Sequence, residues 1–293
     1  NDWKNRADRK PLILRGARQV GKTSIIRLFG EGYDEYLEFN LDKEEERELF
    51  SHRISATELV QLLLISRDKT GTGSVLLFID EIQNSANAIG MLRYLYEECP
   101  HIHVISAGSI LEIIMEKEDI GFPVGRVEHL NMYPLTFREY LVATGRDRLL
   151  EEWHSFPLPE SLHRTMLKSF HTYVLIGGMP EIVANYAEHR DVPSLNHIYK
   201  ALLTTYRDDV TRYAAGASTG AVLRHCLETA PFEAGKRIKY AGFGQSRYSS
   251  REVGEALKIL EQAMVLELIH PSTSLSIPIV PDFRKSPKLQ FLD

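Results

Sequence analysis

A glycine-rich segment near the start of the chain has the residues needed to bind the phosphates of a nucleotide. Residues 16–23 read Gly-Ala-Arg-Gln-Val-Gly-Lys-Thr and follow the apolar run 11–14. The glycines allow a tight turn in which consecutive N–H groups face an anion, and the helix expected from Lys22 adds its N-terminal partial charge. We predict that Lys22 contacts the β- and γ-phosphates and that the Thr23 hydroxyl contacts Mg²⁺. The predicted phosphate-binding set is Gly16, Ala17, Arg18, Gln19, Val20, Gly21, Lys22, Thr23 and Ser24.

Two adjacent acids at the end of a later apolar run could form the second half of this site. Residues 74–81 read Ser-Val-Leu-Leu-Phe-Ile-Asp-Glu, which is typical of a strand buried on both faces of a parallel sheet. Ligands of such sheets bind at the carboxyl ends of the strands. We predict that Asp80 holds Mg²⁺, usually through water, and that Glu81 orients and deprotonates the attacking water. The alternative for the run alone is a strand that ends in solvated acids.

Composition limits the class of protein. The chain has 293 residues, 43% hydrophobic and 26% charged, which suits a soluble protein of two or three domains. A formal net charge of −5 gives no general reason to expect nucleic-acid binding, so any such surface must be local. Cys99 and Cys226 stand outside any paired motif and are interpreted as thiols of a reducing compartment. No apolar stretch approaches the ~18–20 residues of a membrane span and no signal peptide is evident, so we predict a cytoplasmic protein.

An alternation of strands and helices must position the two motifs. Residues 11–131 alternate short apolar runs with helical patterns, which is typical of a parallel α/β sheet. The glycine-rich segment follows the first of these runs, and the two acids end the third. Strands are predicted at 11–14, 36–41, 75–79, 102–106 and 127–131, with helices at 22–29, 43–50, 56–66, 87–98 and 109–117.

From Pro134 onward the sequence is predominantly helical. Residues 136–139, Thr-Phe-Arg-Glu, have the pattern of a helix capping box, and residues 177–180, Gly-Gly-Met-Pro, separate two helices. From about residue 231 a helix is accompanied by strand-like runs, an order that fits a small winged-helix module. The predicted helices are at about 160–176, 181–190, 194–213, 219–229 and 249–263, and the strand-like runs are 265–269 and 277–280.

Together these motifs resemble those of a widespread group of bacterial and archaeal AAA-type P-loop ATPases. The matching segments extend along nearly the whole chain: 15–23, 77–83, 106–109, 122–126, 133–137, 177–181 and 288–293. The expected fold class is α/β, with a parallel-sheet P-loop NTPase core followed by an all-helical region and a small winged-helix module. The expected domains are the ATPase core at 1–133, a helical lid region at 134–230, the winged helix at 231–286, and at 287–293 the start of a truncated domain related to restriction endonucleases.

The resemblance also implies further contacts to ATP. Such ATPases place a polar sensor residue at the end of the strand beside the acidic one, where Ser106 and Ser109 are the candidates; we assign Ser109. The alternative for this segment is a small-residue turn. Arg126 stands where an arginine could reach the γ-phosphate within one subunit or across a subunit interface. Residues 177–180 are interpreted as a structural turn rather than a nucleotide contact.

A local basic cluster interrupts the acidic chain near its C-terminal end. Between residues 236 and 251 there are five cations and no acids, interleaved with Tyr240, Phe243 and Tyr248. Such cations could contact DNA phosphates through a winged helix. The alternative is an internal or protein interface, because winged helices also serve as joints between proteins. The cations are Lys236, Arg237, Lys239, Arg247 and Arg251.

The sequence therefore predicts an enzyme that binds ATP and Mg²⁺ and hydrolyses the ATP. The predicted catalytic residues are Lys22, Glu81, Ser109 and Arg126, and the predicted metal ligands are Thr23 and Asp80. One hypothesis is a machine that couples hydrolysis to a DNA- or partner-directed task. The other is a slowly hydrolysing, ATP-gated switch whose winged helix is a protein–protein joint.

Overall fold

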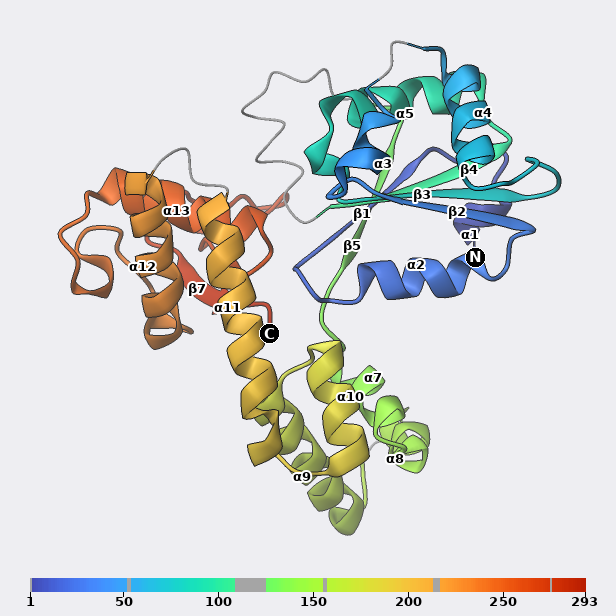
Figure 1. The fold of residues 1–293 in the computed structure, drawn as a ribbon. Helices are drawn as coiled ribbons and strands as arrows, with labels where there is room; N and C mark the ends of the chain where they lie inside the picture. The colour runs from blue at the N-terminus through green and yellow to red at the C-terminus, as the bar shows by residue number, and fades with distance from the viewer. Residues whose placement is uncertain (1, 52–53, 109–124, 155–156, 213–216, 275) are drawn as a thin grey trace. The chain divides into compact units, whose positions relative to one another are not determined.

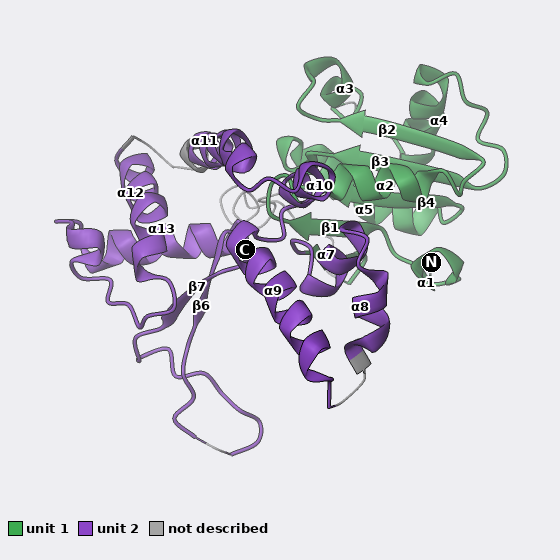
Figure 2. Cartoon of the chain, turned by 90° about the horizontal axis from the view of Figure 1, so that it is seen from below, with its two compact units in different colours: residues 1–132 green, residues 133–293 purple. Residues whose placement is uncertain are grey.

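The computed structural model describes residues 2–51, 54–108, 125–154, 157–212, 217–274 and 276–293. The chain divides into two compact units, residues 1–132 and 133–293, which are coloured separately in Figure 2. Each unit has its own apolar clusters and is described by itself. None of the helices that the structure describes is long and apolar enough to cross a membrane.

Unit 1 is built on a five-stranded sheet in which every strand pair is parallel. The strand order is β2-β3-β4-β1-β5, and all residues of β3 are buried, as expected for an apolar run inside a parallel sheet. The predicted parallel sheet is confirmed, with strand ends shifted by no more than about two residues. The strands are β1 (Leu12–Gly16), β2 (Glu35–Asn40), β3 (Val75–Asp80), β4 (Ile102–Ala107) and β5 (Glu128–Met132).

Helices cover both faces of this sheet (Figure 1). Ile13 and Ile79 belong to the cluster on the α4 and α5 face, whereas Phe78 packs with Ile26 of α2 on the other face. Because alternate residues of a strand share a face, Asp80 projects to the α2 face with Phe78. The helices are α1 (Asp2–Asn5), α2 (Lys22–Gly30), α3 (Glu44–Glu48), α4 (Ala56–Ser66) and α5 (Ala86–Glu98), with the 3₁₀ turn η1 (Ile82–Asn84). The helix predicted at 109–117 lies outside the described residues.

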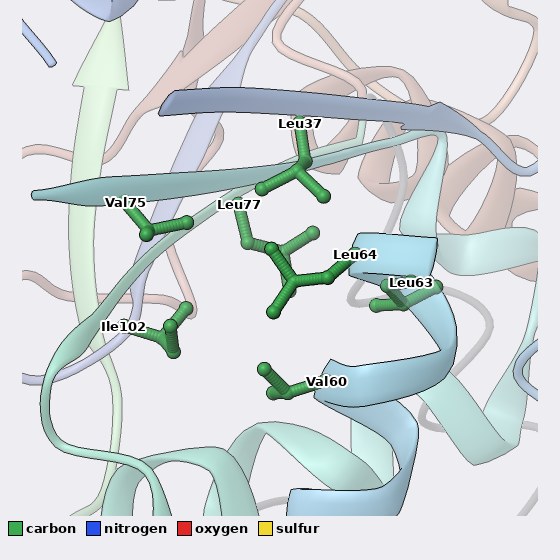
Figure 3. A pocket seen from close by; sticks show the side chains of 7 residues that line it. All are labelled: Leu37, Val60, Leu63, Leu64, Val75, Leu77 and Ile102. Carbon is green, nitrogen blue, oxygen red and sulfur yellow. The ribbon is translucent and has the colours of Figure 1, made fainter. Parts of the chain in front are cut away.

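Packing between the sheet and α4 leaves only a very small void. Its volume is about 10 Å³, and only aliphatic side chains from β2, β3, β4 and α4 line it (Figure 3). A void of this size without polar partners has no room for a ligand. The lining residues are Leu37, Val60, Leu63, Leu64, Val75, Leu77 and Ile102.

The first part of unit 2 is a group of helices around one apolar cluster. The predicted capping box is present: Thr136 Oγ1 accepts from the Glu139 N–H at 3.3 Å, and the Thr136 N–H donates to Glu139 Oε2 at 2.7 Å. The short α8 was not predicted. The helices are α7 (Phe137–Ala143), α8 (Asp147–Glu151), α9 (Glu160–Ile176), α10 (Pro180–His189) and α11 (Asn196–Arg212), with 3₁₀ turns η2 (Glu152–His154) and η3 (Pro193–Leu195).

The last part of unit 2 combines two helices with a two-stranded antiparallel sheet around a second cluster. Ser249 caps α13 with a second capping box, formed with Glu252. The order of helix, turn, helix and strand pair agrees with the order expected of a winged helix, whose assignment stays a prediction. The elements are α12 (Ala217–Glu233), the 3₁₀ turn η4 (Phe243–Gln245), α13 (Ser250–Gln262), β6 (Leu266–Ile269) and β7 (Lys288–Phe291).

The structure of this module differs from the sequence predictions in three places. The run 277–280 forms no strand, because Pro278 and Pro281 lack the N–H that a sheet needs. Instead, β7 pairs with β6, and Leu289 is fully buried in the second cluster. Residues 287–293, expected to begin a further domain, therefore contribute a strand to unit 2. The boundary expected at 230 falls inside α12, whose apolar face packs in the same cluster.

Candidate nucleotide-binding site

The glycine-rich loop lies between the carboxyl end of β1 and the first turn of α2, where open parallel sheets bind ligands. Gly21 has a φ of 97°, in the left-handed region that favours glycine. At Gly16, a Cβ would lie 2.5 Å from the Met132 carbonyl oxygen and 2.9 Å from Val20 Cγ1. One glycine is thus needed for backbone conformation and the other for space. The first N–H groups of α2 have no partner within the helix and can face an anion.

The Lys22 ammonium group folds back over this loop. Its Nζ donates to the carbonyl oxygens of Gly16 and Ala17, each at 2.9 Å. Burial lowers the pKa of Lys22, and the negative charges of Glu81 and Asp80 oppose that shift. Because the lysine stem is flexible, the ammonium can exchange these carbonyl oxygens for phosphate oxygens at the mouth of the loop.

A direct hydrogen bond joins the glycine-rich loop to the acidic motif. Thr23 Oγ1 donates to Asp80 Oδ2 at 2.8 Å, although the two residues are 57 positions apart. The Glu81 N–H donates to Asp80 Oδ1 at 3.0 Å, so both carboxylate oxygens are held. Hydroxyl and carboxylate oxygens are the ligand types that Mg²⁺ takes in nucleotide sites. The structure thus brings the two predicted metal ligands together.

Asp80 is a strongly desolvated carboxylate. It is 7% exposed, and burial raises its pKa, while the bonds from Thr23 and the Glu81 N–H and the charge of Lys22 oppose the rise. A desolvated anion gains from a nearby cation. This environment suits a divalent ion next to Asp80.

Glu81 occupies a tight turn and is held by a neighbouring amide. Its φ of 52° and ψ of 42° are left-handed, an uncommon conformation for a residue other than glycine. The Gln83 Nε2 donates to Glu81 Oε2, and Gln83 is 6% exposed. A Cβ on Gly108, at the end of β4, would lie 2.3 Å from Gln83 Oε1, so the glycine makes room for the amide. No pattern in the sequence alone indicates a role for Gln83.

Glu81 is a stronger base than an ordinary glutamate. Burial raises the pKa of Glu81 most, and the charges of Asp80 and Asp42 raise it further. The Gln83 hydrogen bond and the charge of Arg18 oppose this rise. A higher pKa brings a carboxylate closer to the range in which a general base works at neutral pH. The site therefore holds a metal-type ligand pair and a candidate base on consecutive residues.

Comparison with protein-family models matches residues 8–141 to an AAA domain. The matched stretch contains both the glycine-rich loop and the acid pair. Residues 8–141 are a P-loop AAA domain. Residues 167–293 match a second model, described as a domain of unknown function (DUF8612), and β7 lies within it.

Comparison with solved structures finds weak overall similarity. The chain is similar to the Aeropyrum pernix ORC1 protein in complex with DNA, at 15% identity over 97% of this chain and 83% of that chain, with a TM-score of 0.35. It is also similar to the Aeropyrum pernix ORC2 protein in ADPNP–ADP complexes, at 13% identity over 89% and 82%, with a TM-score of 0.36. A comparison with curated proteins gives no match.

The predicted sensor residues are not joined to the acid pair. Ser106 lies on β4 beside Ile79, and its neighbours on the same face, Ile102 and Val104, belong to the α4–α5 cluster. Since Asp80 projects to the opposite face, Ser106 does not meet it. Among the described residues, the buried Ser106 Oγ has no hydrogen-bond partner. Ser109, the assigned sensor, lies outside the described residues.

Arg126 lies at the other end of the AAA domain's sheet. It precedes β5, whose first residue, Glu128, is in register with Leu12 at the start of β1. The glycine-rich loop begins four residues further along β1, about 13 Å away at ~3.3 Å per residue. Arg126 Nε instead donates to Glu97 Oε1 at 3.1 Å. Within one subunit, the structure does not bring Arg126 to the loop.

Residues 177–180 form a tightly enclosed turn in unit 2. A Cβ on Gly178 would lie 2.2 Å from the Leu135 carbonyl oxygen. The Gly178 N–H donates to the Asp293 carboxylate, and the Gly178 carbonyl oxygen accepts from the Leu135 N–H at 2.7 Å. Packing within unit 2 therefore explains why residue 178 is a glycine.

The basic cluster presents its cations outward and its aromatic rings inward. All five cations, residues 236, 237, 239, 247 and 251, are exposed. Phe243 is 3% exposed, and Tyr240 and Tyr248 pack against the second cluster of unit 2. The rings therefore pack into the core of unit 2. Two of the exposed cations form ion pairs on the surface, Lys236 with Glu233 at 3.9 Å and Arg251 with Glu255 at 2.9 Å.

Proposed function

We propose that the AAA domain binds ATP with Mg²⁺ and hydrolyses the bound ATP. The observation that carries this proposal is the 2.8 Å hydrogen bond between Thr23 and Asp80. It joins a complete phosphate-binding loop to an acid pair at the carboxyl edge of a parallel sheet, the position at which such folds hold nucleotides.

Each part of the loop has a separate role in this proposal. The backbone N–H groups of residues 16–24 and the start of α2 bind the phosphates, and Lys22 neutralises the β- and γ-phosphates. Thr23 and Asp80 would hold Mg²⁺, which when bound supplies charge neutralisation at the phosphates. The buried carboxylate and the adjacent hydroxyl fit that ion.

Glu81 acts as the base in this proposal. Burial raises the pKa of Glu81, which makes its carboxylate a better acceptor for a proton from water. Ser109 is proposed as the polar sensor of the γ-phosphate. Arg126 is proposed to act on the γ-phosphate of a neighbouring subunit, since its own loop lies at the opposite end of the strands.

Calorimetric titration with ATP and Mg²⁺, together with measurement of phosphate release, tests the proposal. We expect one nucleotide per chain and measurable release of phosphate. Lys22→Ala should abolish both signals, whereas Lys69→Ala, which removes an exposed lysine of the same unit, should change neither. Equal ATP affinity in Lys22→Ala and the unaltered protein would refute the loop assignment.

The second candidate function is an ATP-gated switch with slow turnover. The observation that favours it is the amide of Gln83, which occupies a carboxylate oxygen of Glu81 and restrains the base. A restrained base would leave ATP bound for long periods, so that a lid or partner could respond to occupancy. Turnover per minute, measured with and without DNA, separates the candidates: a machine accelerates on its substrate, and a switch does not.

DNA is the proposed partner of a working ATPase, through a winged-helix module formed by α12, α13, β6 and β7. The support is the row of exposed cations between residues 236 and 251. Because the interleaved aromatic rings are packed inside, the contact is expected to involve phosphates rather than stacked bases. Binding should therefore depend weakly on sequence and fall steeply with salt.

Fluorescence anisotropy with a labelled duplex tests this partner. Replacing Arg247 and Arg251 with alanine should weaken binding to all sequences and reduce the salt slope by ~1–2 units. Lys200→Ala, which removes an exposed cation of α11, is the control. Absence of binding at low salt would favour a protein–protein joint instead.

A further inference from the structure

Unit 2 contains an open cavity of about 550 Å³ that the proposed ATPase does not use. The turn that follows α7 forms one side of it, and residues of α9 and of the end of α10 form the rest. A volume of ~300–1,000 Å³ is typical of sites for small molecules. This cavity is therefore large enough for a metabolite-sized ligand.

The lining of this cavity is basic and contains no acid. Arg146, Lys168 and Arg190 contribute cations from three separate segments of the chain. Among the residues that the structure describes, none of the three forms an ion pair with a carboxylate, whereas many other arginines of the chain do. Three like charges that converge on one concavity repel one another, and an anion between them relieves that repulsion.

Two of the cations are held in place by hydrogen bonds to buried groups. Arg146 Nη1 donates to Ser169 Oγ at 3.1 Å, and Arg190 Nη2 donates to the Thr144 carbonyl oxygen at 2.6 Å. Ser169 and Thr144 are 2% and 3% exposed, respectively. Each guanidinium keeps further N–H donors for a ligand, because arginine carries several in one plane. The cations are thus positioned before any ligand arrives, which reduces the entropy lost on binding.

The backbone conformation of Arg190 also bears on the position of its guanidinium group. Its φ of 56° is left-handed, at a helix end where glycine or asparagine is usual. A residue with a side chain is strained in that conformation, so the guanidinium is held at the cavity at a cost in stability.

We propose that this cavity binds a small molecule that carries phosphate groups. Planar guanidinium groups match phosphate oxygens in pairs, and Lys168 adds a mobile point charge. The hydroxyl-bearing side chains of Thr172 and Tyr186, which also line the cavity, supply the polar contacts that an ester portion of the ligand needs. The cavity shares no residue with the glycine-rich loop, so this proposal stands whether or not the AAA domain hydrolyses ATP.

Calorimetric titration with sodium pyrophosphate, without Mg²⁺, tests the proposal on protein that carries Lys22→Ala, so that the loop does not contribute. We expect saturable binding of one pyrophosphate per chain. Adding Lys168→Gln should weaken it at least tenfold, and adding Lys200→Gln, a lysine of α11 outside the cavity, should change it less than twofold.

A second variant and a second ligand make the test decisive. Arg190→Asn removes the guanidinium but keeps a residue that tolerates the left-handed backbone, and it should weaken binding to a similar extent. Circular dichroism melting confirms that the variants remain folded. Absence of pyrophosphate binding, or binding unchanged by both substitutions, would overturn the proposal. So would tighter binding of a glutamate-rich peptide than of pyrophosphate, since it would assign the cavity to a protein partner.

Discussion

The Thr23 hydroxyl lies 2.8 Å from Asp80 Oδ2 and donates a hydrogen bond to it. This contact links the first turn of α2 to the carboxyl end of β3, at the edge of the sheet where the glycine-rich loop turns. Both are hard oxygen ligands and the carboxylate is buried, so the pair fits the divalent cation that we propose for this site.

Replacement of Thr23 should distinguish the contribution of the metal to nucleotide affinity from that of the phosphates. Thr23→Val keeps the shape of the side chain and removes the hydroxyl, so the affinity for ATP with Mg²⁺ should fall by about tenfold or more, while the affinity for ADP without Mg²⁺ should change little. Calorimetric titration of both ligands measures the difference. Thr23→Ser retains the hydroxyl and is the control. An equal loss for both ligands would mean that the hydroxyl supports the loop and not the ion.

Replacement of Gln83 should release the base. Gln83→Met preserves the length of the side chain and removes the amide that donates to Glu81, so the rate of ATP hydrolysis at neutral pH should rise severalfold. Phosphate release measures that rate. Gln61→Met, at an exposed position of α4, should leave it unchanged. A lower rate would show that Gln83 helps to place Glu81 for catalysis instead of restraining it.

The pH dependence of hydrolysis separates this role from a merely structural one. A base must be ionised, so the rate falls as pH drops through the pKa of Glu81, which burial raises above the ordinary glutamate value of ~4.3. The Gln83 hydrogen bond lowers that pKa, so Gln83→Met should move the acidic limb to higher pH. A general loosening of the fold would change the rate without moving the limb.

His103 should make unit 1 less stable in acid. Burial and the charges of Arg9 and Lys4 lower its pKa to about 4, against ~6.5 in the unfolded chain. The unfolded chain therefore binds more protons between these values, so the stability that is complete above pH ~6.5 is lost as pH falls toward 4. The Nδ1 atom of His103 lies 2.7 Å from the Tyr33 hydroxyl, so a hydrogen bond holds the ring at this buried position.

Urea unfolding at pH 7 and pH 5 measures this effect. Trp3, whose ring centroid lies 5.9 Å from that of His103, reports on unit 1 when Trp153 is replaced by phenylalanine. The drop in unfolding free energy between the two pH values should be smaller in His103→Gln than in His101→Gln, which changes an exposed histidine. An identical drop in both variants would assign the acid sensitivity to other groups.

The sequence predicts those parts of the fold that depend on local patterns. A strand buried on both faces is a continuous apolar run, so β3 and the edge at which Asp80 lies can be read directly, whereas the edge strands β2 and β5 mix apolar and polar residues. The two glycines are equally informative, since a left-handed φ at Gly21 and the close approach of the Met132 carbonyl oxygen to Gly16 leave no other residue type suitable. Capping boxes at Thr136 and Ser249 mark helix starts for the same reason: their hydrogen bonds are local.

The remaining features depend on contacts between distant residues. A proline-containing loop separates β6 from β7, so residues 288–291 alone do not indicate that they pair with β6. Gln83 contacts Glu81 where the backbone of Glu81 is left-handed, and the space for its amide comes from Gly108, which follows β4. The basic cavity gathers three cations from separate helices and turns, which no sequence window contains together.

The most direct test of the account compares Glu81→Gln with the unaltered protein in ATP binding and in ATP hydrolysis. The substitution keeps the size of the side chain and removes the proton acceptor, so ATP affinity should remain within about twofold while hydrolysis slows by ~10²–10⁴-fold. Calorimetric titration and phosphate release on the same preparation measure both quantities. Retained affinity with a strongly reduced rate is the predicted result, and an undiminished rate would contradict the assignment of Glu81 as the base.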